Sequence, residues 1–273
     1  MGKRQPRPWI VSDELWSLIA PLLPKPGPKL VEGRPRVPDR QAFCGILFVL
    51  HTGIQWEYLP QELGFGSGMT CWRRLAAWNE AGVWDQLHAV LLKELRSKNQ
   101  LDWSRAVIDS SHVRAARPGP KSGPSPVDRA RPGSKHHVIT DGQGIPLAVS
   151  LTGGNRNDVT QLLPLLDKIP AIGGGVVGRP RHRPDLLFAD RGYDHDKYRR
   201  LVRARGIRPV IAERGQPHGT GLGVFRWVVE RTISWLHGFR RLRIRWERRD
   251  DIHEAFLGIA TCLITHRHVQ RLC

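Results

Sequence analysis

The chain has 273 residues, enough for one large domain or two smaller ones around a substantial buried core. Lys and Arg total 43 against 25 Asp and Glu, so the formal net charge is +18 and a polyanionic partner is predicted. Nucleic acid is favoured over a surface that is basic only for solubility. The apolar stretches are too short to span a membrane, and residues 1–10 lack the apolar segment of a secretory signal. We therefore expect a cytoplasmic protein.

Residues 12–97 have the pattern of four helices. Ser12 is the expected N-cap of the first helix, because acidic residues follow it, and Pro21 marks the end of that helix. A second helix is expected after Asp39, where apolar residues recur at the spacing of a buried stripe, and it should end near Gly53.

The third and fourth helices are expected at 70–81 and 83–97, with a glycine break between them. Short helices joined in this way are compatible with a helix-turn-helix module that places polar side chains in the major groove of DNA. The alternative is a helical cap that only packs on the rest of the protein, and helical spacing does not separate the two. The side chains that would face DNA are Arg73, Arg74 and Asn79.

From residue 100 the pattern changes to strands and then to alternating strands and helices. Three leading strands, a helix, and then strand and helix units form the order of a ribonuclease H-like mixed sheet flanked by helices. We therefore predict an α/β fold with an all-α helical domain at 1–99 and a ribonuclease H-like domain at 100–273. The expected strands are 105–113, 136–141, 146–152, 186–190 and 207–212, and the expected helices are 158–168, 194–205, 224–238 and 251–268.

Two acids stand where buried strands end. Asp109 closes the apolar run from Ala106 to Ile108, and Asp190 closes the run that begins at Leu186. In open α/β sheets ligands bind at this edge, so both carboxylates are candidate site residues. The competing interpretation is that each acid only stabilises a turn, and Asp194 is a rival to Asp190 within the same segment.

A third acid, Glu230, lies on an expected amphipathic helix. At 100° per residue, Arg226, Glu230 and His237 fall within about 40° of one another beside the buried stripe. One face of the helix therefore presents an acid flanked by two phosphate-binding groups. The alternative for Glu230 is a solvated acid on the outer face of the helix.

Three carboxylates in a basic protein suggest metal-dependent cutting and joining of DNA strands. Such chemistry needs an in-line nucleophile and neutralisation of charge on two oxygens, which two Mg²⁺ ions about 4 Å apart supply. Mg²⁺ prefers carboxylate oxygens and water, and Mn²⁺ accepts similar ligands. Asp109, Asp190 and Glu230 are therefore the expected ligands of two Mg²⁺ ions, with Mn²⁺ as a substitute.

Basic side chains add a predicted channel for the DNA backbone. Several of them crowd the segment that follows the helix of Glu230, and others lie in the β-rich region or next to the acid itself. The alternative is that these runs are solvated faces. The candidate DNA contacts are Lys135, His136, Arg226, His237, Arg240, Arg241 and Arg243.

A series of short motifs in fixed order covers nearly the whole chain and resembles the DDE transposases of bacterial insertion sequences, in particular the IS-five family within the IS-four-like group. In the first half these are Glu14-Leu15-Trp16, Gly33-Arg34-Pro35-Arg36, Thr52-Gly53-Ile54-Gln55-Trp56 and Thr70-Cys71-Trp72-Arg73-Arg74-Leu75. In the second half they are Ile108-Asp109-Ser110-Ser111-His112-Val113, Gly133-Ser134-Lys135-His136-His137, Asp190-Arg191-Gly192-Tyr193-Asp194 and Arg226-Trp227-Val228-Val229-Glu230-Arg231.

The resemblance implies an N-terminal module that binds the terminal inverted repeats of an element and a catalytic domain whose DDE triad is Asp109, Asp190 and Glu230. It also implies cleavage of DNA ends, joining of 3′-hydroxyls to target DNA, and a dimer or higher assembly on DNA. The chain departs from the wider group's signature at two positions. Gly223 stands in the place of a Tyr and His237 in the place of a Lys, so phosphate binding by His237 would depend on pH.

Two other functions fit the same sequence. One is a DNA-binding regulator without catalysis, derived from a decayed element. The other is a ribonuclease H-like nuclease that cuts DNA but does not join strands. The intact acids argue against the first, and only an assay for joined products separates the second.

Overall fold

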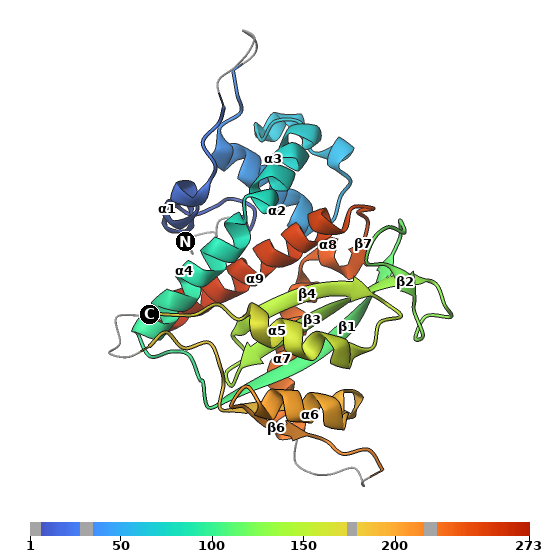
Figure 1. Cartoon of the computed structure of the whole chain (residues 1–273). Helices are drawn as coiled ribbons and strands as arrows, with labels where there is room; N and C mark the ends of the chain where they lie inside the picture. Colours follow the sequence, from blue (N-terminus) through green and yellow to red (C-terminus); the bar gives the residue numbers. More distant parts are fainter. Residues whose placement is uncertain (1–6, 28–34, 174–178, 216–222) are drawn as a thin grey trace, which may run out of the picture.

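The computed structural model describes residues 7–27, 35–173, 179–215 and 223–273. A helical region packs at one end of a mixed sheet, and further helices cover both faces of that sheet (Figure 1). Gly33 and Arg34, half of one motif noted in the sequence, lie outside the described residues. Within the described ranges, no helix is both long and apolar enough to cross a membrane.

The four helices predicted in the first hundred residues are confirmed. Ser12 caps the first helix, since its Oγ accepts a hydrogen bond from the backbone N–H of Leu15 at 3.2 Å. Ser67 caps the third helix in the same way, so this helix begins two residues before the predicted Thr70. The helices are α1 (Asp13–Ile19), α2 (Asp39–Thr52), α3 (Gly68–Glu80) and α4 (Val83–Ser97), with short 3-10 turns η1 (Ala20–Leu22), η2 (Trp56–Tyr58) and η3 (Gln61–Leu63).

One apolar core joins the helical region to the rest of the chain. The ring of Phe43 in α2 stacks on Trp84 of α4, with ring centroids 5.7 Å apart. The long C-terminal helix α9 (Asp250–Leu272) packs against α3 and α4 on one side and against the sheet strand β4 on another. Because this core is shared, the domain boundary predicted near residue 99 stays a prediction.

The strands and helices after residue 100 follow one another along the chain in the order predicted for a ribonuclease H-like fold. Its central strand β1 (Arg105–Ala115) pairs antiparallel with β3 (Pro132–Asp141), which pairs antiparallel with β4 (Pro146–Gly153). On its other side β1 pairs parallel with β5 (Leu186–Ala189), which pairs parallel with β6 (Arg208–Ile211). Two short strands complete the sheet. β2 (Gly123–Pro124) pairs antiparallel with β3, and β7 (Ile244–Arg245) pairs parallel with β1.

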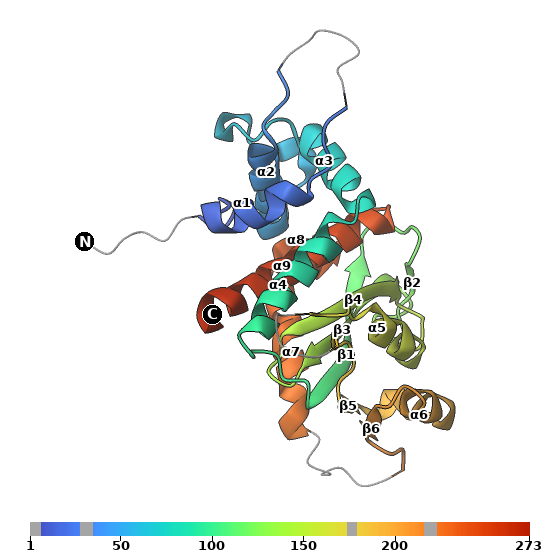
Figure 2. The ribbon, with the colours of Figure 1, turned by 60° about the vertical axis from the view of Figure 1, so that its left-hand side comes forward.

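Alternating side chains of β1 divide the core between the two faces of the sheet. Val107 belongs to the core that includes α9 and α7 (Gly223–Gly238), whereas Ala106 and Ile108 belong to a second core. The second core includes α5 (Leu162–Lys168) and α6 (Asp196–Arg203), which lie on the opposite face from α7 (Figure 2). Odd-numbered positions of β1 therefore point toward α7. The remaining short helices are η4 (Asp158–Gln161), η5 (Arg191–Tyr193) and α8 (Arg240–Arg243).

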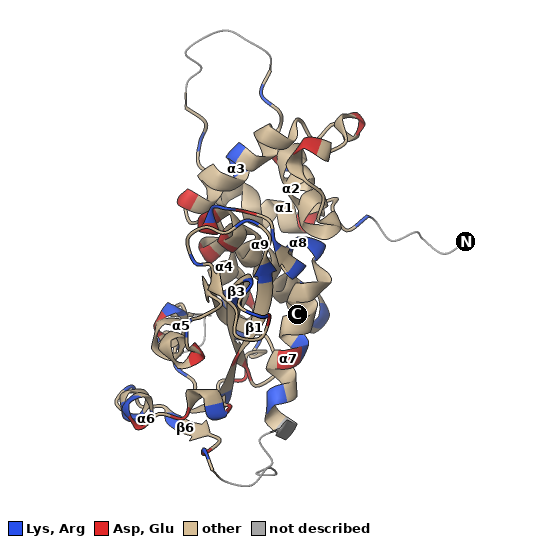
Figure 3. Cartoon of the chain, turned by 90° about the vertical axis from the view of Figure 1, so that its right-hand side faces the viewer, with Lys and Arg blue, Asp and Glu red and all other residues tan. Residues whose placement is uncertain are grey.

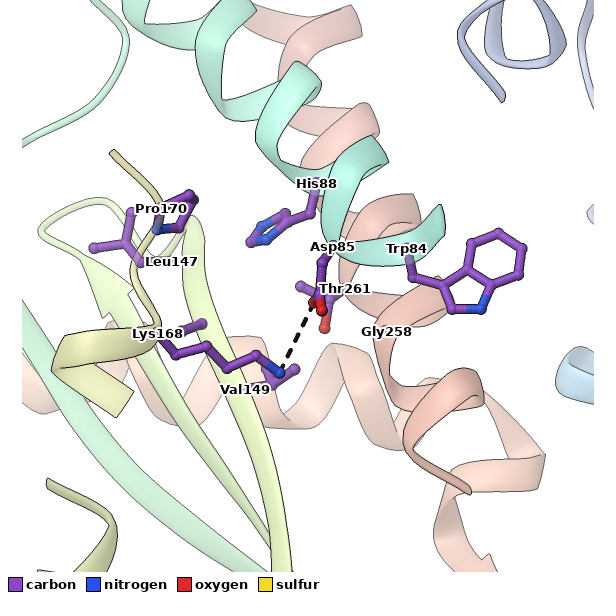
Figure 4. A pocket seen from close by; sticks show the side chains of 10 residues that line it. Trp84, Asp85, His88, Leu147, Val149, Lys168, Pro170, Gly258 and Thr261 are labelled. Carbon is purple, nitrogen blue, oxygen red and sulfur yellow. Dashed lines mark ion pairs between the residues drawn. The ribbon is translucent and has the colours of Figure 1, made fainter. Parts of the chain in front are cut away.

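A small cavity of about 180 Å³ lies where α4 and α9 meet β4 (Figure 4). An ion pair crosses its opening, with Lys168 Nζ 3.8 Å from a carboxylate oxygen of Asp85. His88 lines the cavity, and its Nε2 lies 2.9 Å from the backbone oxygen of Pro146, so Nε2 carries a hydrogen and donates. Burial is the main cause that lowers the pKa of His88 to about 4.

His88 makes the free energy of unfolding depend on pH in the acidic range. Between pH 6.5 and about 4 the unfolded chain binds a proton at His88 and the folded chain does not, so the free energy of unfolding falls as pH falls. The contribution is about 1.4 kcal/mol per pH unit in that window. We expect His88→Gln to reduce the slope of unfolding free energy against pH by this amount in urea titrations. Equal slopes for the two proteins would contradict the assignment.

Candidate active site

The register of the sheet brings Asp109 and Asp190 to neighbouring positions. Val107 of β1 pairs with Phe188 of β5, and each acid stands two residues further along its own chain. The Oδ1 of Asp109 accepts a hydrogen bond from the N–H of Ser110, and the Oδ1 of Asp190 accepts one from the N–H of Gly192, each at 2.8 Å. The predicted location at the strand ends is confirmed for Asp190, whereas Asp109 lies inside β1. One oxygen of each acid stabilises the local backbone and the other remains for further contacts.

Helix α7 brings Glu230 and Arg226 over this edge. One terminal nitrogen of Arg226 lies 3.0 Å from Asp109 Oδ2, 4.0 Å from Asp190 Oδ2 and 3.6 Å from Glu230 Oε1. The acidic side chains are 16%, 37% and 57% exposed in the same order. The site is therefore a partly open group of three carboxylates around one guanidinium.

The electrostatics of the site follow from burial and from this shared cation. Burial raises the pKa of Asp109 and the charge of Asp190 adds to the rise, whereas Arg226 opposes both. Burial alone would lower the pKa of Arg226, but the carboxylates outweigh it and raise that pKa. In the described ranges no group of three or more His, Cys, Asp or Glu side chains has the arrangement of a metal site. The three acids are grouped around an arginine instead.

Asp194, the local rival to Asp190, has structural partners. Its Oδ1 lies 2.7 Å from a terminal nitrogen of Arg199, and its Oδ2 accepts a hydrogen bond from the N–H of Arg214 at 2.8 Å. These contacts tie the turn before α6 to the segment after β6. The geometry favours Asp190 as the member of the carboxylate group.

His237 lies two turns beyond Glu230 and also faces β1. Its Nε2 is 3.2 Å from the hydroxyl oxygen of Ser111. Burial and the charge of Arg243 lower the pKa of His237, so its imidazole is neutral at pH 7. The predicted contact of His237 with phosphate stays a prediction, and at pH 7 a neutral ring would make it through a hydrogen bond and not through charge.

Three of the predicted DNA contacts lie in the interior. Lys135 Nζ is 2.8 Å from Asp158 Oδ1, and His136 is fully buried with its Nε2 2.9 Å from Nε2 of His253. Arg241 is 4% exposed, and its guanidinium binds Glu247 Oε1 at 2.5 Å as well as backbone oxygens of α2's end. These side chains hold the fold together, so the structure corrects their assignment to DNA contacts.

Of the polar residues predicted to face DNA from α3, Arg73 is exposed. Arg74 forms an ion pair with Asp39 at the start of α2, and the amide nitrogen of Asn79 donates to the backbone oxygen of Asp251 at 3.2 Å. Two of these three side chains, Arg74 and Asn79, therefore make contacts within the protein. Of the basic residues predicted to contact DNA after α7, Arg240 and Arg243 are exposed. Figure 3 shows Lys and Arg positions in blue beside α8.

Tyr193 was not selected from the sequence, although it belongs to the motif that begins at Asp190. It is 1% exposed, and its hydroxyl has no hydrogen-bond partner among the described residues. Burial raises its pKa well above the usual value, and the charges of Asp158, Asp109 and Asp190 add to this rise. The tyrosine therefore forms an uncharged floor beside the carboxylates. The sequence feature that could have identified Tyr193 is its position three residues after Asp190, within the same motif.

Comparison with known proteins decides the family. Residues 11–88 match a family model described as "Putative transposase of IS4/5 family", and residues 103–220 and 187–266 match two models described as "Transposase DDE domain". A putative transposase for insertion sequence element IS402 of Burkholderia cepacia is 60% identical over 167 residues, which are 61% of this chain and 77% of that protein. The chain belongs to the DDE transposases of the IS4/5 family.

This transposase is also similar to a second protein of the same insertion element and to one solved structure. An uncharacterized 16.2 kDa protein of insertion element IS402, also from Burkholderia cepacia, is 55% identical over 43% of this chain and 81% of its own length. Among solved structures, the Mos1 strand transfer complex aligns with 90% of this chain and 79% of that chain, at 11% identity and a TM-score of 0.35.

Proposed function

We propose that this transposase binds the terminal inverted repeats of its insertion sequence, cleaves the DNA ends by metal-dependent hydrolysis and joins the freed 3′-hydroxyls to target DNA. The observation that carries the proposal is the group of three carboxylate oxygens within 4.0 Å of a single arginine nitrogen. A formal charge of +18 supports DNA as the partner. Since two ends are cut together, a dimer or higher assembly on DNA belongs to the proposal.

The chemistry of the three acids suits divalent metal ions, although their present arrangement around Arg226 is not that of a metal site among the described residues. Asp109, Asp190 and Glu230 would hold two Mg²⁺ ions, or Mn²⁺ ions, because all three side chains supply the oxygen donors that these ions prefer. Their oxygens already converge on a cation, the guanidinium of Arg226, which supports a positive charge at this position. When bound, the metal ions would activate the attacking oxygen and neutralise the charge on the leaving oxygen.

The chain's own groups would orient the DNA around this site. Arg226, once released from the acids, would reach a phosphate oxygen beside them, because its planar guanidinium binds phosphate as well as carboxylate. The exposed Arg240 and Arg243 would neutralise backbone phosphates further along α8. The buried, uncharged Tyr193 would limit water below the reacting phosphate.

We predict that Arg226→Gln lowers the free energy of unfolding of the metal-free protein and increases the stabilisation that added metal gives. Without the guanidinium, Asp109 is left buried beside two other acids, so the free energy of unfolding should fall by about 1–3 kcal/mol. Adding Mn²⁺ should then raise the unfolding temperature more than it does in the unmodified protein, because no arginine competes for the carboxylates. The exposed Arg200 of α6 offers a matched control, Arg200→Gln. An unchanged Mn²⁺ response in Arg226→Gln would contradict the prediction.

The function is tested with purified protein, a duplex carrying the element's end sequence, a separate target duplex and Mg²⁺. We expect nicked ends and, in addition, products in which end and target are joined. Binding without any metal-dependent cutting would favour the regulator from a decayed element. Cutting without joined products would favour the nuclease.

A further inference from the structure

The outer side of α7 carries a stack of aromatic and basic side chains that the proposed chemistry does not use. The guanidinium carbon of Arg231 lies 4.4 Å from the ring centroid of Trp227 and 4.7 Å from that of Trp235. The ring of Trp235 in turn lies 5.5 Å from the imidazole of His268 on α9. Trp227 is 50% exposed, although it is a large apolar side chain. These four residues, together with Arg267 and Arg271, are called the α7–α9 ladder below.

A cavity of about 220 Å³ lies at the α9 end of this ladder, lined by Trp235, Ile264, Arg267, His268 and Arg271. Arg267 and Arg271 are exposed, and α7 packs against α9 at this place. In the part of the chain that the structure describes, none of Arg231, Arg267 and Arg271 forms an ion pair with a carboxylate. An aromatic wall beside several unneutralised arginines is suited to a polyanion with flat groups.

The neighbouring histidine shows the excess of positive charge independently. Burial lowers the pKa of His268 to about 4, and the charges of Arg231, Arg271 and Arg267 contribute to the decrease. The carboxyl group that acts on Arg231 is Asp141, which is buried in the turn after β3. The exposed arginines of the ladder have no carboxylate partner among the described residues, so the ladder carries a net positive charge.

The ladder and the carboxylates lie on different sides of one helix. Arg231 follows Glu230 directly, so its side chain is rotated from that of Glu230 by about 100° about the helix axis. Trp227 lies one turn before Arg231, near the level of Arg226 and Glu230. A DNA strand held at the carboxylates would leave the ladder uncovered, yet a second duplex lying on the ladder would pass close to them.

We propose that the α7–α9 ladder binds the sugar–phosphate backbone of the target duplex. This inference rests on the proposed function, because the target phosphodiester must reach the same carboxylates as the element's end. Arg267 and Arg271 contact phosphates at the cavity, and Trp227 packs on sugars nearer the acids. Recognition is independent of base sequence, since these groups contact the backbone.

The test compares the full-length double variant Arg267→Ala, Arg271→Ala with a control, Arg200→Ala, Arg203→Ala, which removes the same charge from exposed positions of α6. Affinity for a duplex unrelated to the element is measured at several salt concentrations. We expect the ladder variant to bind this duplex about tenfold more weakly, with a salt slope smaller by roughly 2. The control should change much less.

The same proteins are assayed for nicking of end DNA and for joined products. The ladder variant, and separately Trp227→Ala, should keep nicking at the level of the unmodified protein and lose about tenfold in joining. Equal affinity and joining in ladder and control variants overturn the proposal, and so does a parallel loss of nicking and joining. If the unmodified protein never nicks, the proposed function has failed, whereas the binding comparison still reports on the ladder.

Discussion

Asp109→Asn should reduce metal-dependent cleavage of end DNA by at least about 10³-fold while the protein stays folded. Asp109 is the most buried of the three acids and lies nearest to the shared cation. An asparagine keeps the size of the side chain and one oxygen, but its amide neither carries charge nor coordinates metal through both positions. Asp190→Asn and Glu230→Gln should give the same result.

The measurement is the rate of end cleavage at saturating Mg²⁺, together with thermal unfolding of each variant. Asp167→Asn is the matched control, because Asp167 is an exposed acid of α5 that pairs with Arg205. It should cleave at the normal rate. Normal cleavage by all three site variants would mean that these carboxylates do not carry the reaction.

Arg241→Met should lower the free energy of unfolding by about 3–5 kcal/mol. Arg241 and Glu247 are buried together, and the guanidinium also satisfies the backbone oxygens of Gly53 and Ile54. Removing the arginine leaves the buried carboxylate, among the described residues, with only His253 Nδ1, 3.6 Å away, which is a costly way to break such a pair. The double variant Arg241→Met, Glu247→Met should recover much of the loss.

Urea unfolding of the single and double variants measures this effect. The neighbouring Arg240 is exposed, so Arg240→Met should change the free energy of unfolding by less than about 0.5 kcal/mol. A stable Arg241→Met protein whose affinity for DNA is reduced would instead restore Arg241 as a DNA contact. The two arginines are adjacent in sequence, so the comparison isolates burial as the cause.

Much of the fold could be predicted because local chemistry decides it. The N-cap at Ser12 and the left-handed end of α2 at Gly53, with φ 76°, follow from residue type alone. The order of strands along the chain follows from apolar runs separated by turns, and the placement of Asp109 and Asp190 follows from the ends of two such runs. Local patterns therefore located the candidate carboxylates.

The partners of the basic residues could not be predicted in the same way. Arg241 binds an oxygen of Gly53, which is 188 positions away, and Asn79 binds Asp251 from 172 positions away. A cluster of arginines in the sequence does not show which side chains will be buried in internal contacts and which will be exposed to solvent. Arg226 was expected to meet phosphate, and the structure places it on the carboxylates instead.

The central claim is that Asp109, Asp190 and Glu230 together hold the catalytic metal. The most direct measurement is anomalous scattering from Mn²⁺ in crystals of the full chain bound to end DNA. The account predicts manganese peaks within about 2.5 Å of oxygens from all three side chains, with Arg226 displaced from them. Manganese bound elsewhere, or acids still closed around Arg226 beside an ordered scissile phosphate, would contradict it.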